Sequence, residues 1–305
     1  MFTWRRSRLK KAMKSKRLRL VYNPNAGRRK LTGQLDTAIR IFQESGHEVC
    51  IHRASSSEDI EKIASQSMDV DRLVIAGGDG SIHQAVNGLL RIAANKRPVL
   101  GILPVGTAND LAYALHLPKS IPDACQVIGK GNSFKMDTGK LNDRYFVNVA
   151  SAGLLTDVSQ KVDTHVKNTL GQLAYFLKGI ETLPSFKPFR VEFDRDGNRY
   201  TEEVVLFMAV NGLSVGGLRN LVPRASLTDG KLDILVVPAA GWPETLRLLL
   251  SILTGEKVKA EKIMEFHTSE LTVLTDRPIN SDLDGEAGPE STWHIEMGPK
   301  ISVLC

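Results

Sequence analysis

Short apolar runs alternate with longer amphipathic stretches over the first 130 residues of the chain. The runs, which are rich in β-branched residues and have the length of buried strands, lie at residues 18–22, 48–52, 72–76 and 99–103. Between the first two runs, Leu35, Ile39 and Phe42 recur at intervals of four and three residues, which predicts a helix. Strands that alternate with helices predict an α/β domain with a parallel sheet. Ligands of such sheets bind at the carboxyl ends of the strands.

The pattern changes after about residue 137 to many short strand-like runs. These runs lie at residues 145–149, 188–194, 203–210, 231–237, 270–275 and 278–283. Two stretches, 165–182 and 243–253, have helical periodicity instead. Tight turns are indicated by Asp-Gly pairs at residues 196–197, 229–230 and 284–285. This part of the chain therefore predicts a mostly antiparallel, β-rich domain.

The change of pattern suggests how the chain is divided. A length of 305 residues exceeds that of one typical domain. We predict a basic tail at residues 1–16, an α/β domain with a parallel sheet at 17–137 and the β-rich second domain at 138–292. The last segment, from about residue 293 to 305, is expected to return to the α/β domain.

The basic residues gather at the start of the chain. Residues 1–35 contain twelve Arg or Lys residues and no Asp or Glu, so the net charge of +6 becomes −6 for residues 36–305. An acidic body argues against a nucleic-acid groove, whose positive charge would spread over a folded face. The tail, with Phe2 and Trp4, can attract an anionic membrane surface, and a solvated terminus is an equally good interpretation.

The cysteines and the apolar runs limit the cellular setting. The three cysteines lie far apart without a CxxC spacing, which predicts neither a disulfide framework nor a zinc site. No apolar run approaches the length of a membrane span, and the first residues do not have the pattern of a secretory signal. We expect a cytoplasmic protein for which peripheral association with a membrane is an open alternative.

A glycine-rich turn follows the third predicted strand at residues 77–81 (Gly-Gly-Asp-Gly-Ser), and a helical pattern begins at once. Glycines allow backbone amides to approach a phosphate closely, and a helix N-terminus favours negative charge. The turn therefore predicts a phosphate-binding loop, with an ordinary structural turn as the alternative. Its glycine spacing differs from the GxGxxG fingerprint of dinucleotide-binding folds.

A second polar loop follows the fourth predicted strand at residues 104–110 (Pro-Val-Gly-Thr-Ala-Asn-Asp). It lacks the lysine of a P-loop, so that class of nucleotide site is excluded. Thr107 and Asn109 can hydrogen-bond a nucleotide, and Asp110 offers a carboxylate to magnesium or water. Helix capping by Thr107 or Asn109 is compatible with these roles.

Taken together, these motifs resemble the diacylglycerol kinase catalytic family, which includes YegS-like bacterial lipid kinases and sphingosine kinases. The two signature loops are matched by residues 77–89 (GGDGSIHQAVNGL) and 101–112 (GILPVGTANDLA). Further matches are the opening motif Asn23-Pro24-x-x-Gly27, Asp137 at the domain junction, residues 223–237 and LDGE at 283–286. The resemblance extends over residues 18–304.

The resemblance implies an ATP-dependent lipid kinase whose ATP site lies between a nucleotide-binding α/β domain of the NAD-kinase and diacylglycerol-kinase type and a lipid-binding β-rich domain. It implies that Glu286 is the general base that takes the proton of the lipid hydroxyl. Mg²⁺ would be held by Asp229 with the backbone carbonyls of Ser226 and Lys231. Phosphoryl transfer of this kind needs aligned oxygens, neutralised phosphate charge and a base near the acceptor.

The resemblance also implies which residues surround the nucleotide. They are Asn23, Gly77, Gly78, Asp79, Gly80, Ser81, Ile82, His83, Gln84, Thr107, Asn109, Asp110 and Asp137. The three aspartates at 79, 110 and 137 would supply the acidic and water network around the nucleotide's magnesium. The chain departs from the family pattern in its first loop, where Ser81 replaces a threonine and His83-Gln84 replaces a common Asn-Glu pair.

Other functions remain to be weighed against a lipid kinase. An NAD kinase also carries a GGDG loop, but residues 106–110 and the DGE motif favour the lipid branch. A non-catalytic lipid-binding module is a second alternative, against which the intact acidic residues argue. We expect ATP and a lipid at a membrane surface as partners, and no nucleic acid. The acceptor (diacylglycerol, phosphatidylglycerol, a sphingoid base or another lipid alcohol), the nucleotide preference and a homodimer stay open.

Overall fold

The computed structural model describes ten segments of the chain. They are residues 16–24, 31–154, 187–195, 197–219, 222, 225–241, 243–245, 247–248, 263–290 and 292–305. Most of the expected basic tail, Gly27, the helical stretch expected at 165–182 and much of the one at 243–253 lie outside these segments.

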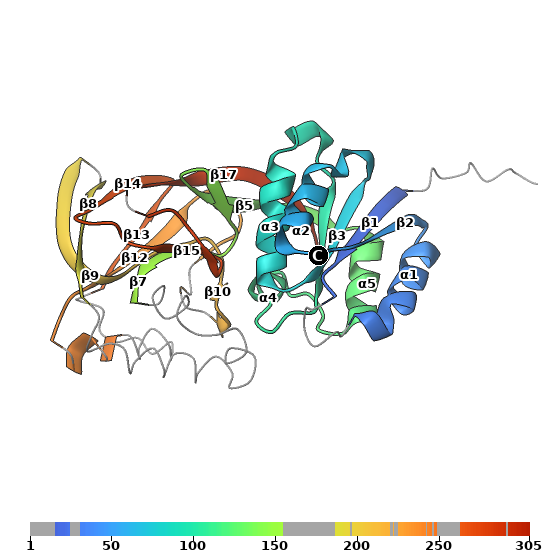
Figure 1. Ribbon diagram of the computed structural model, residues 1–305, viewed down its shortest axis with the longest axis horizontal. Helices are drawn as coiled ribbons and strands as arrows, with labels where there is room; N and C mark the ends of the chain where they lie inside the picture. The colour runs from blue at the N-terminus through green and yellow to red at the C-terminus, as the bar shows by residue number, and fades with distance from the viewer. Residues whose placement is uncertain are drawn as a thin grey trace, which may run out of the picture.

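A parallel sheet forms the centre of the N-terminal domain (Figure 1). Its strands are β1 (Lys16–Tyr22), β2 (His47–Arg53), β3 (Arg72–Gly77) and β4 (Val99–Pro104). They pair in the order β2-β1-β3-β4, each parallel to its neighbour. The expected α/β domain with a parallel sheet is therefore confirmed.

Helices cover both faces of this sheet. The helices are α1 (Leu35–Glu44), α2 (Ser57–Ser65), α3 (Asp79–Leu90), α4 (Asp110–Ala114) and α5 (Ile121–Lys130), with short 3₁₀ turns at Thr32–Gln34, Ser67–Asp69 and Ala94–Lys96. Because side chains alternate along a strand, Leu73 and Ile75 of β3 join the core beneath α2 and α3, whereas Val74 and Ala76 join the core beneath α1 and α5.

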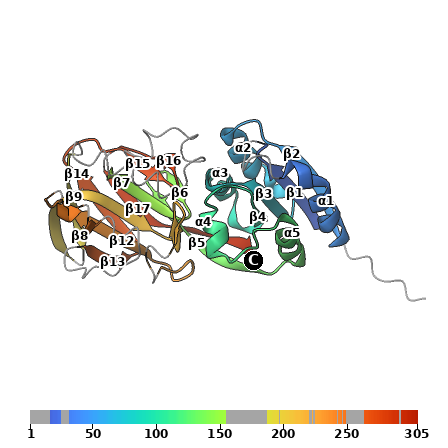
Figure 2. The ribbon, with the colours of Figure 1, turned by 90° about the horizontal axis from the view of Figure 1, so that it is seen from below.

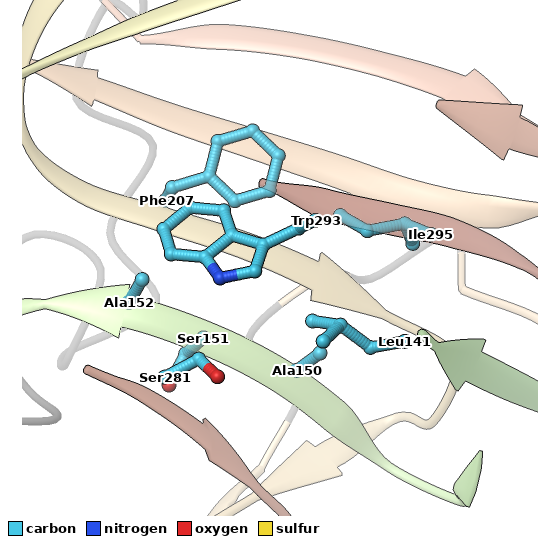
Figure 3. Close-up of a pocket in the computed structure, with 8 residues that line it drawn as sticks. All are labelled: Leu141, Ala150, Ser151, Ala152, Phe207, Ser281, Trp293 and Ile295. Carbon is cyan, nitrogen blue, oxygen red and sulfur yellow. The ribbon is translucent and has the colours of Figure 1, made fainter. Parts of the chain in front are cut away.

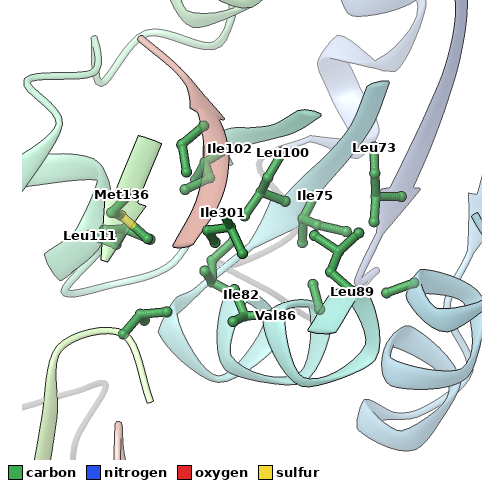
Figure 4. Packing of buried hydrophobic residues seen from close by; sticks show 14 of the residues in the cluster. Leu73, Ile75, Ile82, Val86, Leu89, Leu100, Ile102, Leu111, Met136 and Ile301 are labelled. Atoms are coloured by element: carbon green, nitrogen blue, oxygen red, sulfur yellow. The ribbon is translucent and has the colours of Figure 1, made fainter. Parts of the chain in front are cut away.

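The position of α3 follows from its apolar spacing. Ile82, Val86 and Leu89 recur at intervals of four and three residues and pack against Ile75 and Leu100 of the sheet (Figure 4). Between Val86 and Leu89, Gly88 lies so close to α2 that a Cβ would collide with the backbone of that helix. Packing on the sheet and on α2 therefore fixes α3 with its N-terminus at the carboxyl end of β3.

The second domain is β-rich and mostly antiparallel, as predicted, and its strands form a β-sandwich (Figure 2). Its strands are β5 (Ser133–Leu141), β6 (Arg144–Phe146), β7 (Val149–Gly153), β8 (Phe189–Arg195), β9 (Asn198–Val210), β10 (Ser214–Val215), β11 (Leu218–Arg219), β12 (Leu232–Pro238), β13 (Met264–Thr268), β14 (Glu270–Thr275), β15 (Ser281–Leu283), β16 (Glu286–Ala287) and β17 (Trp293–Leu304).

Aromatic side chains fill the space between the sheets of the sandwich. Trp293 lies at its centre, with its ring 5.9 Å from that of Phe207 and 6.4 Å from that of Phe189, centroid to centroid. The side chains around Trp293 include Leu141 and Ile295, and they close on one another so tightly that the gap between them admits no water molecule (Figure 3). The described part of this core is a packed interior.

Strand β17 belongs to both domains. The first residues of β17 pair antiparallel with β14, and residues 295–304 pair antiparallel with β5. Near its end, Val303 pairs in parallel with Leu100 of β4. A register shift between Gly298 and Ile301 separates the two parts. Through β17 the described strands of both domains, apart from the separate pair β10 and β11, join in one 15-stranded sheet. Figure 1 shows β17 running from one domain into the other.

Two elements differ from the sequence-based expectation. The run expected as one strand at 145–149 divides into β6 and β7, because the amides of Val147 and Asn148 turn away to a carboxylate of the β15–β16 hairpin. Asp137, expected at the end of the first domain, lies within β5. None of the helices in the described segments is long and apolar enough to cross a membrane.

Candidate active site

The two polar loops meet at the carboxyl edge of the parallel sheet. Gly77 of β3 pairs with Pro104 of β4, so the loops that follow start side by side. A Cβ on Gly78 would stand 3.2 Å from the Cα of Gly106, and a Cβ on Gly106 would collide with Gly78. Glycine at both positions therefore allows the two backbones to touch.

The first turn of α3 supplies amide groups at this edge. Gly78 is the N-cap and makes no side-chain capping hydrogen bond. The first helical hydrogen bond runs from the amide of Ile82 to the carbonyl of Gly78, at 3.1 Å. The amides before Ile82 thus belong to the helix end, where no intrahelical acceptor exists and an anion is favoured.

Asp79 ties the first loop to the second. Its Oδ2 accepts a hydrogen bond from the amide of Asn109 at 2.9 Å, and its Oδ1 accepts one from the amide of Asp110 at 2.7 Å. Asn109 has a left-handed backbone (φ +54°), and its side-chain amide bonds both the N–H and the C=O of Gly106 at 2.9 Å. Both expected nucleotide residues, Asp79 and Asn109, therefore shape the loops themselves.

Asp110 joins the α/β domain to the sandwich. Its buried carboxylate accepts hydrogen bonds from Ser214 Oγ at 2.5 Å and from the amide of Gly217 at 2.8 Å. Ser214 starts the short β10, so this contact brings the β10–β11 turn against the N-terminus of α4. The carboxylate expected near magnesium is thus also a contact between domains.

Burial changes the acidity of these two aspartates. The pKa of Asp79 is raised to about 6, chiefly by burial and next by the neighbouring charge of Asp110. Burial likewise raises the pKa of Asp110. The charge of Asp284 adds to both effects. Three carboxylates crowded in this way favour the approach of a positive charge.

Asp284 anchors the β15–β16 hairpin. Its side chain is fully buried, and its carboxylate accepts hydrogen bonds from the amides of Val147 at 2.8 Å, Asn148 at 2.8 Å and Val149 at 3.0 Å. The backbone of Asp284 is left-handed (φ +55°), as a tight hairpin turn requires. The sequence indicates a turn here, but it does not reveal the amides that the aspartate binds.

Glu286, the expected base, follows this turn at the start of β16. Its side chain is partly buried, and its Oε1 lies 2.9 Å from the point where a Cβ on Gly80 would stand. Gly80 belongs to the first turn of α3. The structure therefore brings a carboxylate of the second domain against the predicted phosphate-binding turn of the first.

The remaining residues of the first loop face protein. Ile82 packs in the core beneath α3, and Ser81 is buried beside Gly77. His83 is buried and contacts Asp284. Gln84 Oε1 lies 3.4 Å from a guanidinium nitrogen of Arg144. Of the expected nucleotide residues from 77 to 84, these four therefore have side chains directed toward other parts of the protein.

Two expected residues mark the edges of the site. The amide of Asn23 bonds the carbonyl of Ala76 at 3.1 Å, which places it where β1 and β3 end together. Thr107 is exposed on the second loop. Both positions lie at the carboxyl edge of the sheet, where a nucleotide is expected.

Asp137 lies at the junction with the 226–231 turn. Its Oδ2 accepts a hydrogen bond from the amide of Gly230 at 2.8 Å, and its own amide bonds the carbonyl of Leu227 at 2.7 Å. Its Oδ1 pairs with the ammonium of Lys300 at 2.8 Å. Lys300 also donates to the carbonyl of Thr228 at 3.2 Å. Lys300 carries no local signal in the sequence, because only the course of β17 brings it to this place.

The expected magnesium ligands lie in the same turn. Asp229 is exposed and its Oδ1 accepts a hydrogen bond from the amide of Lys231 at 3.1 Å, while Ser226 Oγ lies 3.3 Å from the amide of Thr228. One carboxylate and two carbonyls are hard oxygen donors, which suit a magnesium ion that keeps part of its water. In the part of the chain that is described, no three His, Cys, Asp or Glu residues gather as a metal site.

Comparison with known proteins agrees with the sequence motifs. Residues 17–141 match the diacylglycerol kinase catalytic domain, and residues 148–305 match the YegS C-terminal NAD kinase beta sandwich-like domain. The chain is 36% identical over 276 residues to a diacylglycerol kinase of Bacillus subtilis (strain 168), with 90% of each protein covered. It is 34% identical over 275 residues to a diacylglycerol kinase of Staphylococcus aureus (strain MRSA252), with 90% of this chain and 87% of that protein covered.

A solved structure has the same fold. The crystal structure of a diacylglycerol kinase from Bacillus anthracis str. Sterne superimposes with a TM-score of 0.80 and 27% sequence identity. The match covers 96% of this chain and 98% of that chain. The similarity therefore extends over both domains and their arrangement.

Proposed function

The chain belongs to the diacylglycerol kinase family and is a lipid kinase, and from this premise we propose that it transfers the γ-phosphate of ATP to the hydroxyl of diacylglycerol. The names of its relatives support this acceptor over phosphatidylglycerol, the principal alternative. Because the acceptor resides in a membrane, the protein is proposed to act as a cytoplasmic enzyme at the membrane surface.

The observation that carries the proposal is the position of Glu286. Its carboxylate comes from the sandwich and lies against Gly80, in the helix turn whose amides favour phosphate. A general base must lie within hydrogen-bond reach of the hydroxyl that attacks the phosphate. In the proposed reaction the lipid hydroxyl passes its proton to Glu286. The hydroxyl oxygen of the lipid then forms a bond to the γ-phosphorus of ATP, and the bond from that phosphorus to the bridging oxygen breaks to release ADP.

The two loops have a different role in this proposal. The backbone around Gly78 and Gly106 approaches the phosphates closely, because neither position carries a side chain. Asp79 holds the loops together through the amides of Asn109 and Asp110. Thr107, which is exposed beside them, is proposed to bond the nucleotide. The loops thus bind and orient ATP, while the base comes from the other domain.

Magnesium is proposed as the metal. A magnesium ion would supply positive charge to offset the nucleotide phosphates and the crowded carboxylates. Asp229, with the carbonyls of Ser226 and Lys231, would hold an ion at the domain junction. The carboxylate of Asp137 orders that turn through the amide of Gly230.

An assay with a panel of acceptors tests the function. Purified protein, radiolabelled ATP and magnesium are incubated with mixed micelles that contain diacylglycerol, phosphatidylglycerol or a sphingoid base, and a further reaction contains NAD. We expect label in the product of diacylglycerol. Label in phosphatidylglycerol alone would move the acceptor to that lipid, label in NAD would favour an NAD kinase, and no label with any acceptor would favour a non-catalytic lipid-binding module.

A further inference from the structure

A buried hydrogen bond joins helix α3 to the hairpin that carries Glu286. His83 Nδ1 lies 3.1 Å from Asp284 Oδ2, and the two side chains are 2% and 0% exposed. Because an ionised carboxylate can only accept, the imidazole donates through its Nδ1–H. Nε2 then faces the side-chain amide of Asn87 at 3.4 Å. Both ring nitrogens of His83 therefore face protein groups, which argues against a direct contact with the nucleotide.

Of the hydrogen bonds that the Asp284 carboxylate accepts from His83 and from the amides of residues 147–149, only the bond from His83 reaches α3. The other three donors are backbone amides of residues 147–149, which link β6 to β7 within the sandwich. Without His83 the turn would still be held to its own domain. However, the hydrogen bond that fixes the position of the turn against α3 of the other domain would be lost.

The register matters because of the spacing on both elements. Gly80 and His83 are three residues apart on α3 and therefore share one face of the helix. Asp284 and Glu286 are two residues apart across the hairpin turn, where Gly285 has φ +95°. His83 meets Asp284 while Gly80 meets Glu286. One helix face thus meets the hairpin at two successive points.

We propose that His83 is a positioning residue for phosphate transfer. Its Nδ1–H holds Asp284 against α3 and thereby keeps the carboxylate of Glu286 over the phosphate-binding turn. The proposal rests on the proposed role of Glu286 as general base. A shift of a reacting group by about 1 Å reduces a rate by as much as 100-fold, so a single buried hydrogen bond at this place affects turnover.

Two substitutions at position 83 separate the donor from the ring. Leucine has a similar size but no donor, so His83→Leu leaves the Asp284 carboxylate without its partner on α3. Asparagine places its amide nitrogen the same number of bonds from Cα as Nδ1, so His83→Asn retains a donor. We expect His83→Leu to lower kcat for diacylglycerol phosphorylation about 10- to 100-fold, with the KM for ATP within about twofold of the parent, and His83→Asn to recover most of that loss.

A control tests whether any loosening of the domain junction has this effect. Arg144→Met breaks the two-pronged ion pair between Arg144 of β6 and Glu61 of α2, whose two N···O distances are both 3.1 Å. We expect its kcat to stay within about twofold of the parent. Equal losses in Arg144→Met and His83→Leu would overturn the specific role of His83. So would parent-like kcat in His83→Leu, or equal impairment in His83→Asn and His83→Leu.

The background of Glu286→Gln distinguishes failure of this proposal from failure of the proposed base. If His83 acts through Glu286, His83→Leu should reduce the residual rate of Glu286→Gln by less than about twofold, because coupled residues are not additive. A full additional loss in the double variant would make the role of His83 independent of the base and overturn the proposal. High activity of Glu286→Gln alone would instead remove the base from the proposed function.

Discussion

Glu286 Oε1 lies 2.9 Å from the position that a Cβ on Gly80 would take. The two residues are more than 200 positions apart and belong to different domains. Their contact has a direct consequence, because the absence of a side chain at Gly80 leaves the space that the carboxylate occupies. The same contact places an acidic group beside the amides at the start of α3.

Gly80→Ala should therefore reduce turnover without unfolding the protein. The added methyl group displaces the Glu286 carboxylate, and we expect kcat to fall about 10- to 100-fold. Alanine favours a helix over glycine by up to about 1 kcal/mol, so the melting temperature should not decrease much. The matched control is Gly33→Ala, since a Cβ there meets nothing within 4 Å. Equal kcat values for the two variants would show that Gly80 does not define the position of the base.

The acidity of Asp79 predicts how stability depends on pH. Its folded-state pKa of about 6 exceeds the usual 3.8, so the folded protein holds a proton that the unfolded chain releases between these values. The free energy of unfolding should thus fall as pH rises from about 4 to about 6, by about 3 kcal/mol at most from this group.

Asp79→Asn removes the titration. Without magnesium, the unfolding free energy of the parent minus that of Asp79→Asn should decrease over this pH range, as measured by urea denaturation. Asp36→Asn, on the exposed side of α1, is the control. Parallel pH profiles for the parent and Asp79→Asn would contradict the raised pKa of Asp79.

Lys300 should contribute to stability through Asp137. Lys300→Met removes the cation that pairs with the buried carboxylate of Asp137 and leaves the hydrogen bond from the amide of Gly230. Because the ammonium is about half exposed, the loss should be about 1–3 kcal/mol, below that for a fully buried pair. Lys140→Met breaks a pair whose carboxylate, that of Glu296, is about half exposed instead of buried, and it should cost less than about 1 kcal/mol. Similar denaturation midpoints for the two variants would show that the burial of Asp137 does not increase the contribution of its ion pair to stability.

Magnesium binding at the 226–231 turn should appear as a thermal shift. An ion that binds only the folded state raises the melting temperature with its concentration. We expect Asp229→Ala to lose this shift and most of the activity. Since the Asp229 side chain is exposed, the melting temperature of the Asp229→Ala variant without magnesium should remain close to that of the parent. Asp143→Ala, another exposed aspartate, should keep the shift. An equal shift in Asp229→Ala would place the ion elsewhere.

The sequence predicts those parts of the fold that have local patterns. The buried runs and the spacing of Ile82, Val86 and Leu89 indicate the parallel sheet and α3, and the glycines of residues 77–80 indicate a phosphate loop. These features depend on the backbone and on neighbouring residues. Periodicity and turn chemistry are therefore sufficient to find them.

Contacts between distant residues have no such local pattern. His83 and Asp284 are 201 positions apart, and Lys300 reaches Asp137 only because β17 passes through both domains. The substitution of His83 for the common asparagine is readable in the sequence. The effect of this substitution is not readable there. Asparagine and histidine both offer a nitrogen donor at the δ position, and its role depends on the buried carboxylate of Asp284 beside it.

The transfer of phosphate by Glu286→Gln tests the central claim most directly. The amide retains the size of the carboxylate but cannot accept the proton of the lipid hydroxyl. We predict that diacylglycerol phosphorylation falls at least about 100-fold while the Kd for ATP stays within about twofold of the parent. Asp284 is poorly suited to replace the base, because its carboxylate already accepts three backbone amides and His83. Turnover of Glu286→Gln within a few-fold of the parent would contradict the account.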